Sequence, residues 1–454
     1  MDWKTQKVLV AGSGKSGIGA TNLLKKVGAE VIIYDGNDKL KEEDVLNKLE
    51  NKEDVKVILG ELEDSVINEI DMMVLSPGIA IDAPFVLRVK EAGVPIWGEI
   101  ELAYVIGKGK LAAITGTNGK TTTTALVGEI MANYYDKVDV VGNIGNPYTT
   151  TAFDSTDDTV TVAEISSFQL ETIHTFKPDV SAVLNITPDH LNRHYTMECY
   201  TDVKMSIAKN QDSNQPIVLN YEDPILREYA GKLTNRIIWF SSKQKVNPGV
   251  YLEGKNIIYA DGKKETFVTT TEDTTLVGIH NVENIMAAIA ISINMDVPVD
   301  IIRETIRKFK AVPHRIEYVE TINDVIYYND SKGTNTDASI KAIEAMSRPT
   351  ILIAGGYDKK VSFDDWAEAF GDKVKCLVLL GQTAEQIADT VKKHGFTNII
   401  FTESLKEAVD ECAKNAKPGD AVLLSPACAS WGMFDNYEQR GDMFKESVRA
   451  MCEK

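Results

Sequence analysis

Short apolar runs recur along the whole chain, and longer mixed segments separate them. Runs of this kind, bounded by glycines and polar turns, are typical of β-strands, and the segments between them are long enough for helices. Alternation of this type favours a wound, mostly parallel sheet. The expected strands fall into three groups: 7–11, 30–35 and 71–75; 111–115, 159–164, 180–185 and 217–220; and 350–354, 376–380, 398–401 and 421–424.

The three groups of strands predict three α/β domains, which agrees with 454 residues at about 150 residues per domain. The glycine-rich stretch 107–110 is typical of a connector, and a second boundary is expected at residues 311–313. Between residues 239 and 277, alternating runs with turns such as Asp261-Gly262 predict a small antiparallel sheet. We therefore expect domains over residues 1–106, 107–311 and 312–454.

Composition narrows the class of protein. Hydrophobic residues make up 43% and charged residues 26% of the chain, which is ordinary for a globular protein and excludes disorder as the main state. The formal net charge of −18 repels phosphate backbones, so we expect neither nucleic acid nor an anionic membrane as a partner. An anionic ligand must instead be held by a few local amides and cations.

The cysteines and the N-terminus predict a cytoplasmic protein. The five cysteines form no zinc-ligand spacing, and a sparse, odd set suits a reducing compartment. The apolar stretch near the N-terminus is too short for a signal peptide, and no run approaches the ~18 apolar residues of a membrane span.

A first glycine loop, Gly12-Ser13-Gly14-Lys15-Ser16-Gly17, follows an expected strand and opens an expected helix. Asp35 ends the next strand, about where a ribose contact is expected. Free amides and the helix dipole favour a diphosphate here. NAD and UDP-linked ligands share that diphosphate, and a tight turn chosen only for packing has the same pattern. An NAD-dependent oxidoreductase is thus one reading of this loop.

A second glycine loop is more specific. Gly116 and Gly119 allow the backbone to wrap around a phosphate, Lys120 can reach the β- and γ-phosphates of ATP, and Thr121 can ligate Mg²⁺. The loop is shorter than the standard phosphate-binding loop, and Ile114 stands where a glycine is usual. A strand before it and a helix after it favour an ATP site over a chance turn. A non-catalytic ATP-binding module remains an alternative to an enzyme.

Two further strand ends carry groups suited to Mg²⁺. Glu164 ends one expected strand, at the edge where wound sheets bind ligands. Asp189-His190 follows the next strand, and a metal role is favoured for His190. The plainer interpretations are a helix-capping acid for Glu164 and a structural histidine for His190.

With these motifs in one segment, the chain resembles the Mur ligases, and folylpolyglutamate synthetases share the central pattern. The segments 76–79, 329–335 and 424–430 resemble the branch of the family that adds D-glutamate to UDP-N-acetylmuramoyl-L-alanine. Gly333 departs from the expected alanine, and Trp431-Gly432-Met433 is a second departure. The alternative within this enzyme class is a related ligase that adds another amino acid.

The resemblance implies a Rossmann-like N-terminal domain that binds the UDP-substrate, a P-loop-type central domain that binds ATP, and a Rossmann-like C-terminal domain that binds the amino acid. It also implies an acyl-phosphate intermediate, a requirement for ATP and two Mg²⁺ ions, and small molecules as partners. We expect a monomer.

Site residues are carried over by position. The resemblance places the catalytic groups at Lys120, Glu164, His190 and Lys204, and the metal ligands at Thr121, Glu164, His190 and Lys204, with Lys204 carbamylated. ATP contacts are expected at Gly116, Thr117, Asn118, Gly119, Lys120, Thr121, Thr122, His280, Asn281, Asn284, His314, Arg315 and Asp330. UDP-substrate contacts are expected at Lys15, Ser16, Asp35, Gly78 and Asn143. D-glutamate contacts are expected at Thr334, Lys359, Ser430 and Tyr437, with Lys360 as the alternative to Lys359.

Overall fold

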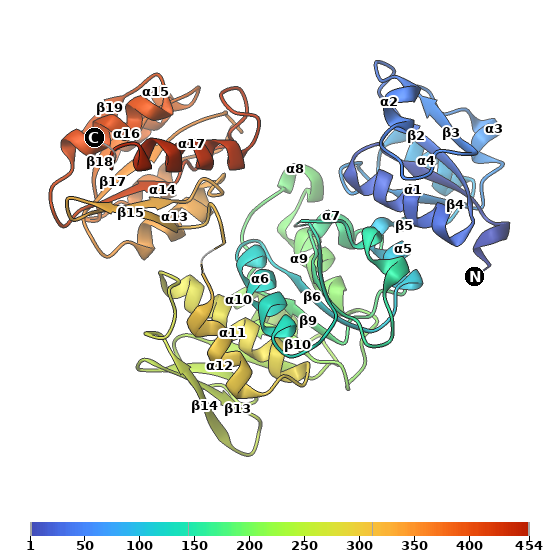
Figure 1. Ribbon diagram of the computed structural model, residues 1–454, viewed down its shortest axis with the longest axis horizontal. Helices are drawn as coiled ribbons and strands as arrows, with labels where there is room; N and C mark the ends of the chain where they lie inside the picture. Colours follow the sequence, from blue (N-terminus) through green and yellow to red (C-terminus); the bar gives the residue numbers. More distant parts are fainter. Residues whose placement is uncertain (1, 144, 311, 453–454) are drawn as a thin grey trace. The chain divides into compact units, whose positions relative to one another are not determined.

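The structure is a computed structural model, and it describes residues 2–143, 145–310 and 312–452. Its strands form three sheets, which in Figure 1 are blue, cyan to yellow, and orange to red along the chain. The chain divides into two compact units. The first comprises residues 1–273 and 283–308 and holds the first two sheets; the second comprises residues 274–282 and 309–454 and holds the third. The expected boundary residue Ala311 lies outside the described residues.

The N-terminal sheet has five parallel strands in the order β3-β2-β1-β4-β5. These are β1 (Lys7–Ala11), β2 (Glu30–Asp35), β3 (Val55–Leu59), β4 (Met72–Leu75) and β5 (Ile96–Gly98). The helices are α1 (Lys15–Val27), α2 (Glu42–Leu46), α3 (Asp64–Ile67), α4 (Pro84–Glu91) and α5 (Glu99–Ile106). Helices α1 and α5 pack on one face and α3 and α4 on the other, so alternate residues of β1 enter separate cores. This is the expected Rossmann-like arrangement.

The central sheet has nine strands in the order β14-β13-β12-β11-β10-β9-β6-β8-β7. The parallel strands are β6 (Lys110–Thr115), β7 (Val138–Gly142), β8 (Val160–Glu164), β9 (Val180–Val183), β10 (Ile217–Asn220) and β11 (Ile237–Ser241). The remaining strands are β12 (Gly249–Glu253), β13 (Asn256–Ala260) and β14 (Glu265–Thr270). The last three are antiparallel to one another, as expected, but β12 pairs with β11. The expected antiparallel strands are therefore present, and they extend the central sheet.

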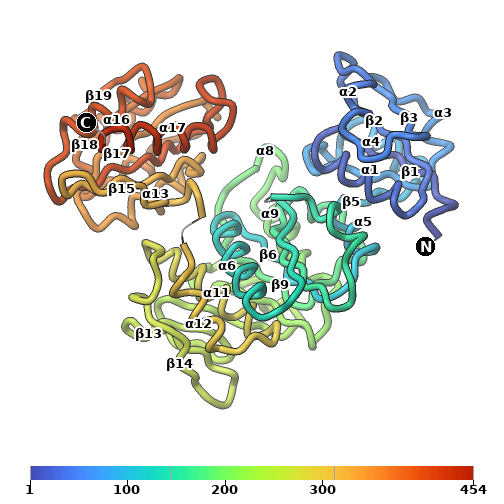
Figure 2. Tube along the Cα trace, in the orientation of Figure 1, coloured from blue at the N-terminus to red at the C-terminus, as the bar shows by residue number. Residues whose placement is uncertain are grey.

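The central segment, cyan to yellow in Figure 2, also contains helices. They are α6 (Lys120–Ala132), α7 (Ser167–Leu170), α8 (Leu191–His194), α9 (Met197–Met205), α10 (Pro224–Ala230), α11 (Ile279–Asn294) and α12 (Val299–Lys308). Among the described residues, no helix has the length and apolar character needed to cross a membrane.

The third sheet has six strands in the order β15-β16-β20-β17-β18-β19. They are β15 (Glu317–Ile322), β16 (Val325–Asn329), β17 (Thr350–Ala354), β18 (Val374–Leu379), β19 (Ile399–Phe401) and β20 (Ala421–Leu424). Only β15 runs antiparallel. Its helices are α13 (Thr336–Ala345), α14 (Asp364–Glu368), α15 (Ala384–Lys393), α16 (Leu405–Asn415) and α17 (Tyr437–Arg449), with α13 to α15 on one face and α16 and α17 on the other.

Candidate active site

The second glycine loop joins β6 to α6 and lies at the carboxyl edge of the central sheet. Gly116 and Gly119 have φ angles of +147° and +84°, which side-chain-bearing residues rarely adopt. A Cβ at Gly119 would also lie 2.2 Å from Oδ1 of Asn284. Both glycines are therefore required by the shape of the loop. The position of Asn284 against the loop agrees with its expected place at the ATP site.

Side chains from the loop and from neighbouring strand ends fix its shape. Lys120 Nζ donates to the carbonyl oxygens of Gly116 and Thr117, at 2.9 and 2.8 Å. The backbone N–H of Asn118 donates to Oδ1 of Asn185, and Nδ2 of Asn185 donates back to the carbonyl of Asn118. The helix α6 begins at Lys120, so Thr121 and Thr122 lie in its first turn. Such a helix start favours a bound anion.

Glu164 ends β8, whose neighbour in the sheet is β6. Its Oε1 accepts a hydrogen bond from Nδ2 of Asn143 at 2.8 Å, and the N–H of Asn143 donates to its carbonyl. Its buried Oε2 accepts no hydrogen bond from any residue that the structure describes. A buried carboxylate oxygen without a donor is suited to a divalent cation. The expected metal role of Glu164 therefore fits its surroundings.

Lys204 on α9 points its ammonium at the same loop. Nζ donates to the Gly116 carbonyl at 2.8 Å, and the side chain is buried. Burial lowers the pKa of Lys204 well below its usual range, and nearby Lys120 lowers it further, while Asp189 and Glu164 oppose the shift. The structure thus gathers Lys120, Lys204 and Glu164 around one loop, with the Lys204 amine disposed to lose its proton.

His190 lies at the exposed side of this group. It precedes α8 with a φ of +53°, its Nε2 lies 3.5 Å from Oδ2 of Asp189, and its ring packs edge-on against Phe168 at 4.8 Å. Within the described part of the chain, no three His, Cys, Asp or Glu side chains are grouped closely enough to hold a metal.

Three residues at this site were missed from the sequence. Asn185 holds the loop through Asn118, and the hydroxyls of Tyr200 and Thr117 lie 3.1 Å apart. His194 is buried with Nε2 3.0 Å from Oγ of Ser167, and burial lowers its pKa to about 4. The sequence did hold a signal for Tyr200, because it precedes Lys204 by one helical turn and shares its face of α9.

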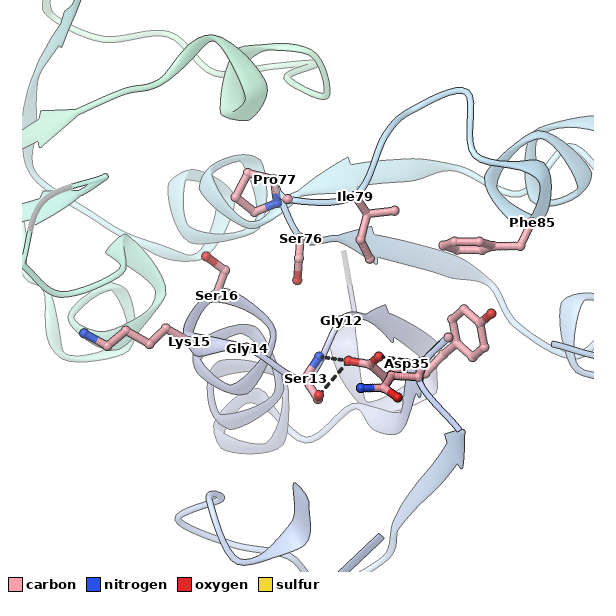
Figure 3. A pocket seen from close by; sticks show the side chains of 14 residues that line it. Gly12, Ser13, Gly14, Lys15, Ser16, Asp35, Ser76, Pro77, Ile79 and Phe85 are labelled. Carbon is pink, nitrogen blue, oxygen red and sulfur yellow. Dashed lines mark hydrogen bonds between the residues drawn. The ribbon is translucent and has the colours of Figure 1, made fainter. Parts of the chain in front are cut away.

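The first glycine loop borders a pocket of about 650 Å³ at the carboxyl ends of β1 and β4, where the strand order reverses (Figure 3). A Cβ at Gly17 would lie 1.8 Å from the Gly12 carbonyl oxygen, so this glycine allows the helix to approach the strand. A Cβ at Gly14 or Gly78 would meet no atom within 4 Å. Packing therefore does not require these two glycines, and the space beside them suits a ligand that approaches the backbone closely.

Asp35 has a structural task in this pocket that the sequence analysis did not assign. Its Oδ2 accepts hydrogen bonds from the N–H and the hydroxyl of Ser13, at 2.9 and 2.6 Å (Figure 3). Burial alone would raise the pKa of Asp35, but the bonds from Ser13 and Asn37 hold it below its usual range. Lys15 and Ser16 also line the pocket, and the Lys15 side chain extends away from Asp35. Asn143 lies at Glu164 instead and does not line this pocket.

The second unit has its own group of loops, at the carboxyl ends of β16, β20 and β17. Asp330 follows β16 and is fully buried, accepting hydrogen bonds from Oγ of Ser425 at 2.7 Å and from the Ile316 N–H. Burial raises the pKa of Asp330 to about 6. A Cβ at Gly333 would lie 2.4 Å from Oδ2 of Asp330. The position of Asp330 therefore explains the glycine at 333.

The expected ATP contacts of this unit lie around Asp330. Nδ1 of buried His314 accepts a hydrogen bond from Nδ2 of Asn329, at 3.1 Å. Burial lowers the pKa of His314, and burial also lowers that of His280 to about 4, with help from the Arg315 charge. Nε of Arg315 is buried and donates to no residue that the structure describes. Arg315 thus has a donor to spare for an anion.

Asn281, the third residue of α11, forms a local hydrogen bond with its side chain. Its Nδ2 donates to the Val277 carbonyl at 2.8 Å, which caps the turn before the helix.

The expected D-glutamate contacts are brought together in part. Lys359 Nζ donates to the Thr334 carbonyl at 3.3 Å, and buried Ser430 lies in the loop after β20. Lys360 has a φ of +57°, and its N–H bonds to Asp358. Tyr437 contacts the loop that carries Thr334: its carbonyl accepts a hydrogen bond from Oγ of Ser331 at 2.8 Å, and Lys332 Nζ lies 5.4 Å from the centroid of its ring.

Arg440 on α17 connects two of these loops, and the sequence gave no reason to single it out. Its guanidinium is buried and donates to the hydroxyl and carbonyl of Ser331 and to the Cys428 carbonyl, at 2.9, 2.8 and 3.2 Å. Burial lowers its pKa to about 10, which leaves it charged at neutral pH. The charge therefore holds the loops after β16 and β20 against each other.

The buried carboxyl group of Glu99 contacts the segment after β8. Oε1 of Glu99 accepts a hydrogen bond from Nε2 of Gln169 at 2.7 Å, and Gln169 in turn caps α7 through Ser166. Oε2 of Glu99 has no partner among the described residues, and burial raises the pKa of Glu99 to about 7. Since an exposed glutamate titrates near 4.5, the folded protein binds a proton that the unfolded chain releases between these pH values.

Glu99→Gln should therefore change how stability depends on pH. The stabilisation from protonated Glu99 is present below about pH 4.5 and is lost as pH rises through about 7. We expect the variant to match the wild type near pH 5 and to gain up to roughly 3 kcal/mol near pH 8, because glutamine keeps the shape without the charge. Chemical unfolding at both pH values measures this, and an unchanged pH dependence in the variant would contradict it.

Sequence models of three domain families match the chain in order. They describe a Mur ligase MurD-like N-terminal domain at residues 6–98, a Mur ligase middle domain at 114–292 and a Mur ligase glutamate ligase domain at 314–428. UDP-N-acetylmuramoylalanine–D-glutamate ligases from Lachnospira eligens and Lachnoclostridium phytofermentans are 58% and 55% identical to the chain, each over 99% of both sequences. The ligase of the same name from Clostridioides difficile is 47% identical over 99% of both.

Solved structures agree in fold. The MurF ligase from Thermotoga maritima in complex with ADP has a TM-score of 0.62 at 17% identity, and the UDP-N-acetylmuramate–alanine ligase from the same organism has a TM-score of 0.61 at 19% identity. Each comparison covers 99% of this chain and 100% of the other. The matches over nearly the whole length show that the chain belongs to the Mur ligase family of ATP-dependent ligases.

Proposed function

We propose that this protein joins D-glutamate to UDP-N-acetylmuramoyl-L-alanine in peptidoglycan precursor synthesis, converting ATP to ADP and phosphate. The observation that carries the proposal is the 58% identity, over nearly the whole chain, to a ligase named for this reaction. The two glycine loops and the loop group of the second unit supply groups of the right chemistry for the three substrates. We further propose that the enzyme is a cytoplasmic monomer with domains over residues 1–106, 107–311 and 312–454.

The reaction needs a poor leaving group to become a good one. The alanyl carboxylate attacks the γ-phosphorus of ATP, ADP leaves, and an acyl phosphate forms. The neutral amine of D-glutamate then attacks the acyl carbon, a C–N bond forms, phosphate leaves with the C–O bond pair, and the nitrogen releases a proton. The protein contributes positioning and neutralisation of charge. We assign that neutralisation to Lys120 and the start of α6.

Mg²⁺ fits the residues around Glu164, because the unpaired Oε2 is a hard oxygen ligand in a buried place. We assign Thr121 and Glu164 to one ion and His190 to a second. Bound Mg²⁺ would neutralise charge on the phosphate oxygens of ATP.

We propose that Lys204 is carbamylated. A neutral lysine amine attacks CO₂, a C–N bond forms, and a proton is released. Burial beside Lys120 favours the neutral amine that this step needs. Lys120 and unmodified Lys204 both bring a cation to the Gly116 carbonyl. Carbamylation would replace the Lys204 cation with anionic oxygens, which would orient the metal.

For the first glycine loop, family membership favours a UDP-linked ligand over NAD. We assign the diphosphate to the loop beside Gly14 and Gly78, with contacts from Lys15 and Ser16. We assign two roles to Asp35, which are to fix the loop through Ser13 and to contact the ligand. Asn143 is assigned to the substrate next to Glu164.

Lys359→Ala should weaken the use of D-glutamate by about ten- to a hundredfold. A charge-assisted hydrogen bond to a carboxylate contributes roughly 1.5–3 kcal/mol, and Lys359 is the cation that lies against Thr334. Steady-state kinetics with each substrate varied in turn should place the loss in the KM for D-glutamate. Lys360→Ala is the matched control and should behave like the wild type. A raised KM for ATP with D-glutamate unaffected would contradict the assignment.

A phosphate-release assay tests the proposed function. With ATP and UDP-N-acetylmuramoyl-L-alanine present, D-glutamate, L-alanine and L-lysine are offered separately. We expect phosphate release with D-glutamate and not with L-alanine or L-lysine. Release with another amino acid instead would make the protein a related ligase of different specificity.

A further inference from the structure

An apolar edge borders the loops that carry Lys359 and Ser430. Tyr357 and Val361 in the loop after β17, and Trp431 and Met433 in the loop after β20, are exposed large hydrophobic side chains. The exposed fraction reaches 58% for Trp431. Of these four, Tyr357 and Trp431 are in direct contact, and adjoining exposed apolar side chains mark ligand-binding or partner-binding surfaces. These four residues are called the apolar edge below.

The apolar edge is held in place by the backbone. The N–H of Tyr357 donates to the Ala429 carbonyl at 2.9 Å, in an isolated antiparallel bridge between the two loops. The rings of Tyr357 and Trp431 pack edge-on with centroids 5.6 Å apart. The two exposed rings pack against each other without a ligand, so the surface is preorganised. Binding a ligand there costs little further side-chain entropy.

The apolar edge adjoins polar donors in the chain and in space. Lys359 follows Tyr357 by two residues, and its Nζ lies 3.3 Å from the Thr334 carbonyl. Ser430 directly precedes Trp431 and is buried. A cation and a hydroxyl beside an aromatic wall suit a ligand that has a carboxylate on a short methylene chain.

We propose that Trp431, supported by Tyr357, is a specificity-determining contact that covers the amino-acid substrate in the second unit. The proposal rests on the proposed function, in which D-glutamate is that substrate. The indole packs on the methylene groups and keeps water from the ion pair between Lys359 and the side-chain carboxylate, which strengthens that pair. Amino acids without the methylene-carboxylate side chain lose both contacts.

Kinetics of Trp431→Ala test this role. We expect the KM for D-glutamate to rise roughly tenfold, the scale of one buried apolar contact, while kcat and the KM values for ATP and the UDP-substrate stay unchanged. Trp431→Phe should restore most of the affinity. Tyr318→Ala removes another exposed aromatic side chain of the same unit, on β15, and should leave all parameters unchanged.

Fluorescence gives a readout that a structural role would not move. The chain has five tryptophans, and Trp366, the other one in this unit, is fully buried. The emission change that D-glutamate causes in the wild type is therefore assigned to Trp431 by its loss in Trp431→Phe. With the UDP-substrate and a non-hydrolysable ATP analogue bound, D-glutamate should change the emission of the wild type and not that of Trp431→Phe.

Two results would overturn the inference: an unchanged KM for D-glutamate in Trp431→Ala, or a rise in all three KM values together. If the wild type does not use D-glutamate at all, the proposed function fails. If the wild type uses D-glutamate and Trp431→Ala binds it equally well, only this inference fails.

Discussion

Lys120→Ala is expected to abolish turnover, with a loss of about a thousandfold or more in kcat, while the UDP-substrate still binds. Lys120 Nζ donates to two loop carbonyls at 2.9 and 2.8 Å, at the start of α6, where we propose that charge on the transferring phosphoryl group is neutralised. Donors aimed at developing charge in a dry site contribute several kcal/mol to the barrier. The pocket that we assign to the UDP-substrate is built on other strands, so its affinity should not depend on Lys120.

Phosphate release measures the first effect, and calorimetric titration with the UDP-substrate measures the second. Lys108→Ala is the control, because Lys108 is an exposed lysine in the connector before β6. A near-normal kcat in Lys120→Ala would contradict the ATP assignment of this loop.

Lys204→Ala is expected to lose about a hundredfold or more in activity and to regain part of it when a short carboxylic acid is added. The reason is that alanine leaves a buried space beside the Gly116 carbonyl, and a small carboxylate can supply the anionic oxygens of the carbamate. Activity is measured with and without acetate or formate, and the same acids should have no effect on the wild type.

Methylammonium separates the two possible roles of Lys204. It imitates the lysine cation, so it should not rescue Lys204→Ala if the working group is the carbamate. Rescue by methylammonium and not by carboxylic acids would contradict carbamylation. Full activity of the variant without any addition would remove Lys204 from the machinery altogether.

Local patterns predicted the strand-loop-helix units of the site. Both glycine loops were found because the apolar strand, the glycines and the following helix are all consecutive in the chain. The hairpin of β15 and β16 was missed because β15 is an edge strand with half-exposed positions, so it lacks a continuous apolar run. The sequence pattern also did not predict which strands pair with each other. The pairing of β12 with β11 joins the antiparallel strands to the central sheet.

Contacts between distant residues could not be predicted. Three hydrogen bonds join residues from different elements: Asp35 with Ser13, Tyr200 with Thr117, and Arg440 with Ser331. A pattern along the chain contains no information on such pairs. Gly333 illustrates the same limit, since only the place of the buried Asp330 carboxylate explains why a Cβ is excluded there.

The most direct test of the central claim follows one oxygen atom. UDP-N-acetylmuramoyl-L-alanine with a heavy-oxygen-labelled carboxylate is incubated with the enzyme, ATP and D-glutamate, and both products are analysed by mass spectrometry. An acyl phosphate passes one carboxylate oxygen to the phosphate that leaves. We therefore expect the D-glutamate-extended product together with labelled phosphate. Unlabelled phosphate, or labelled phosphate without D-glutamate in the product, would contradict the account.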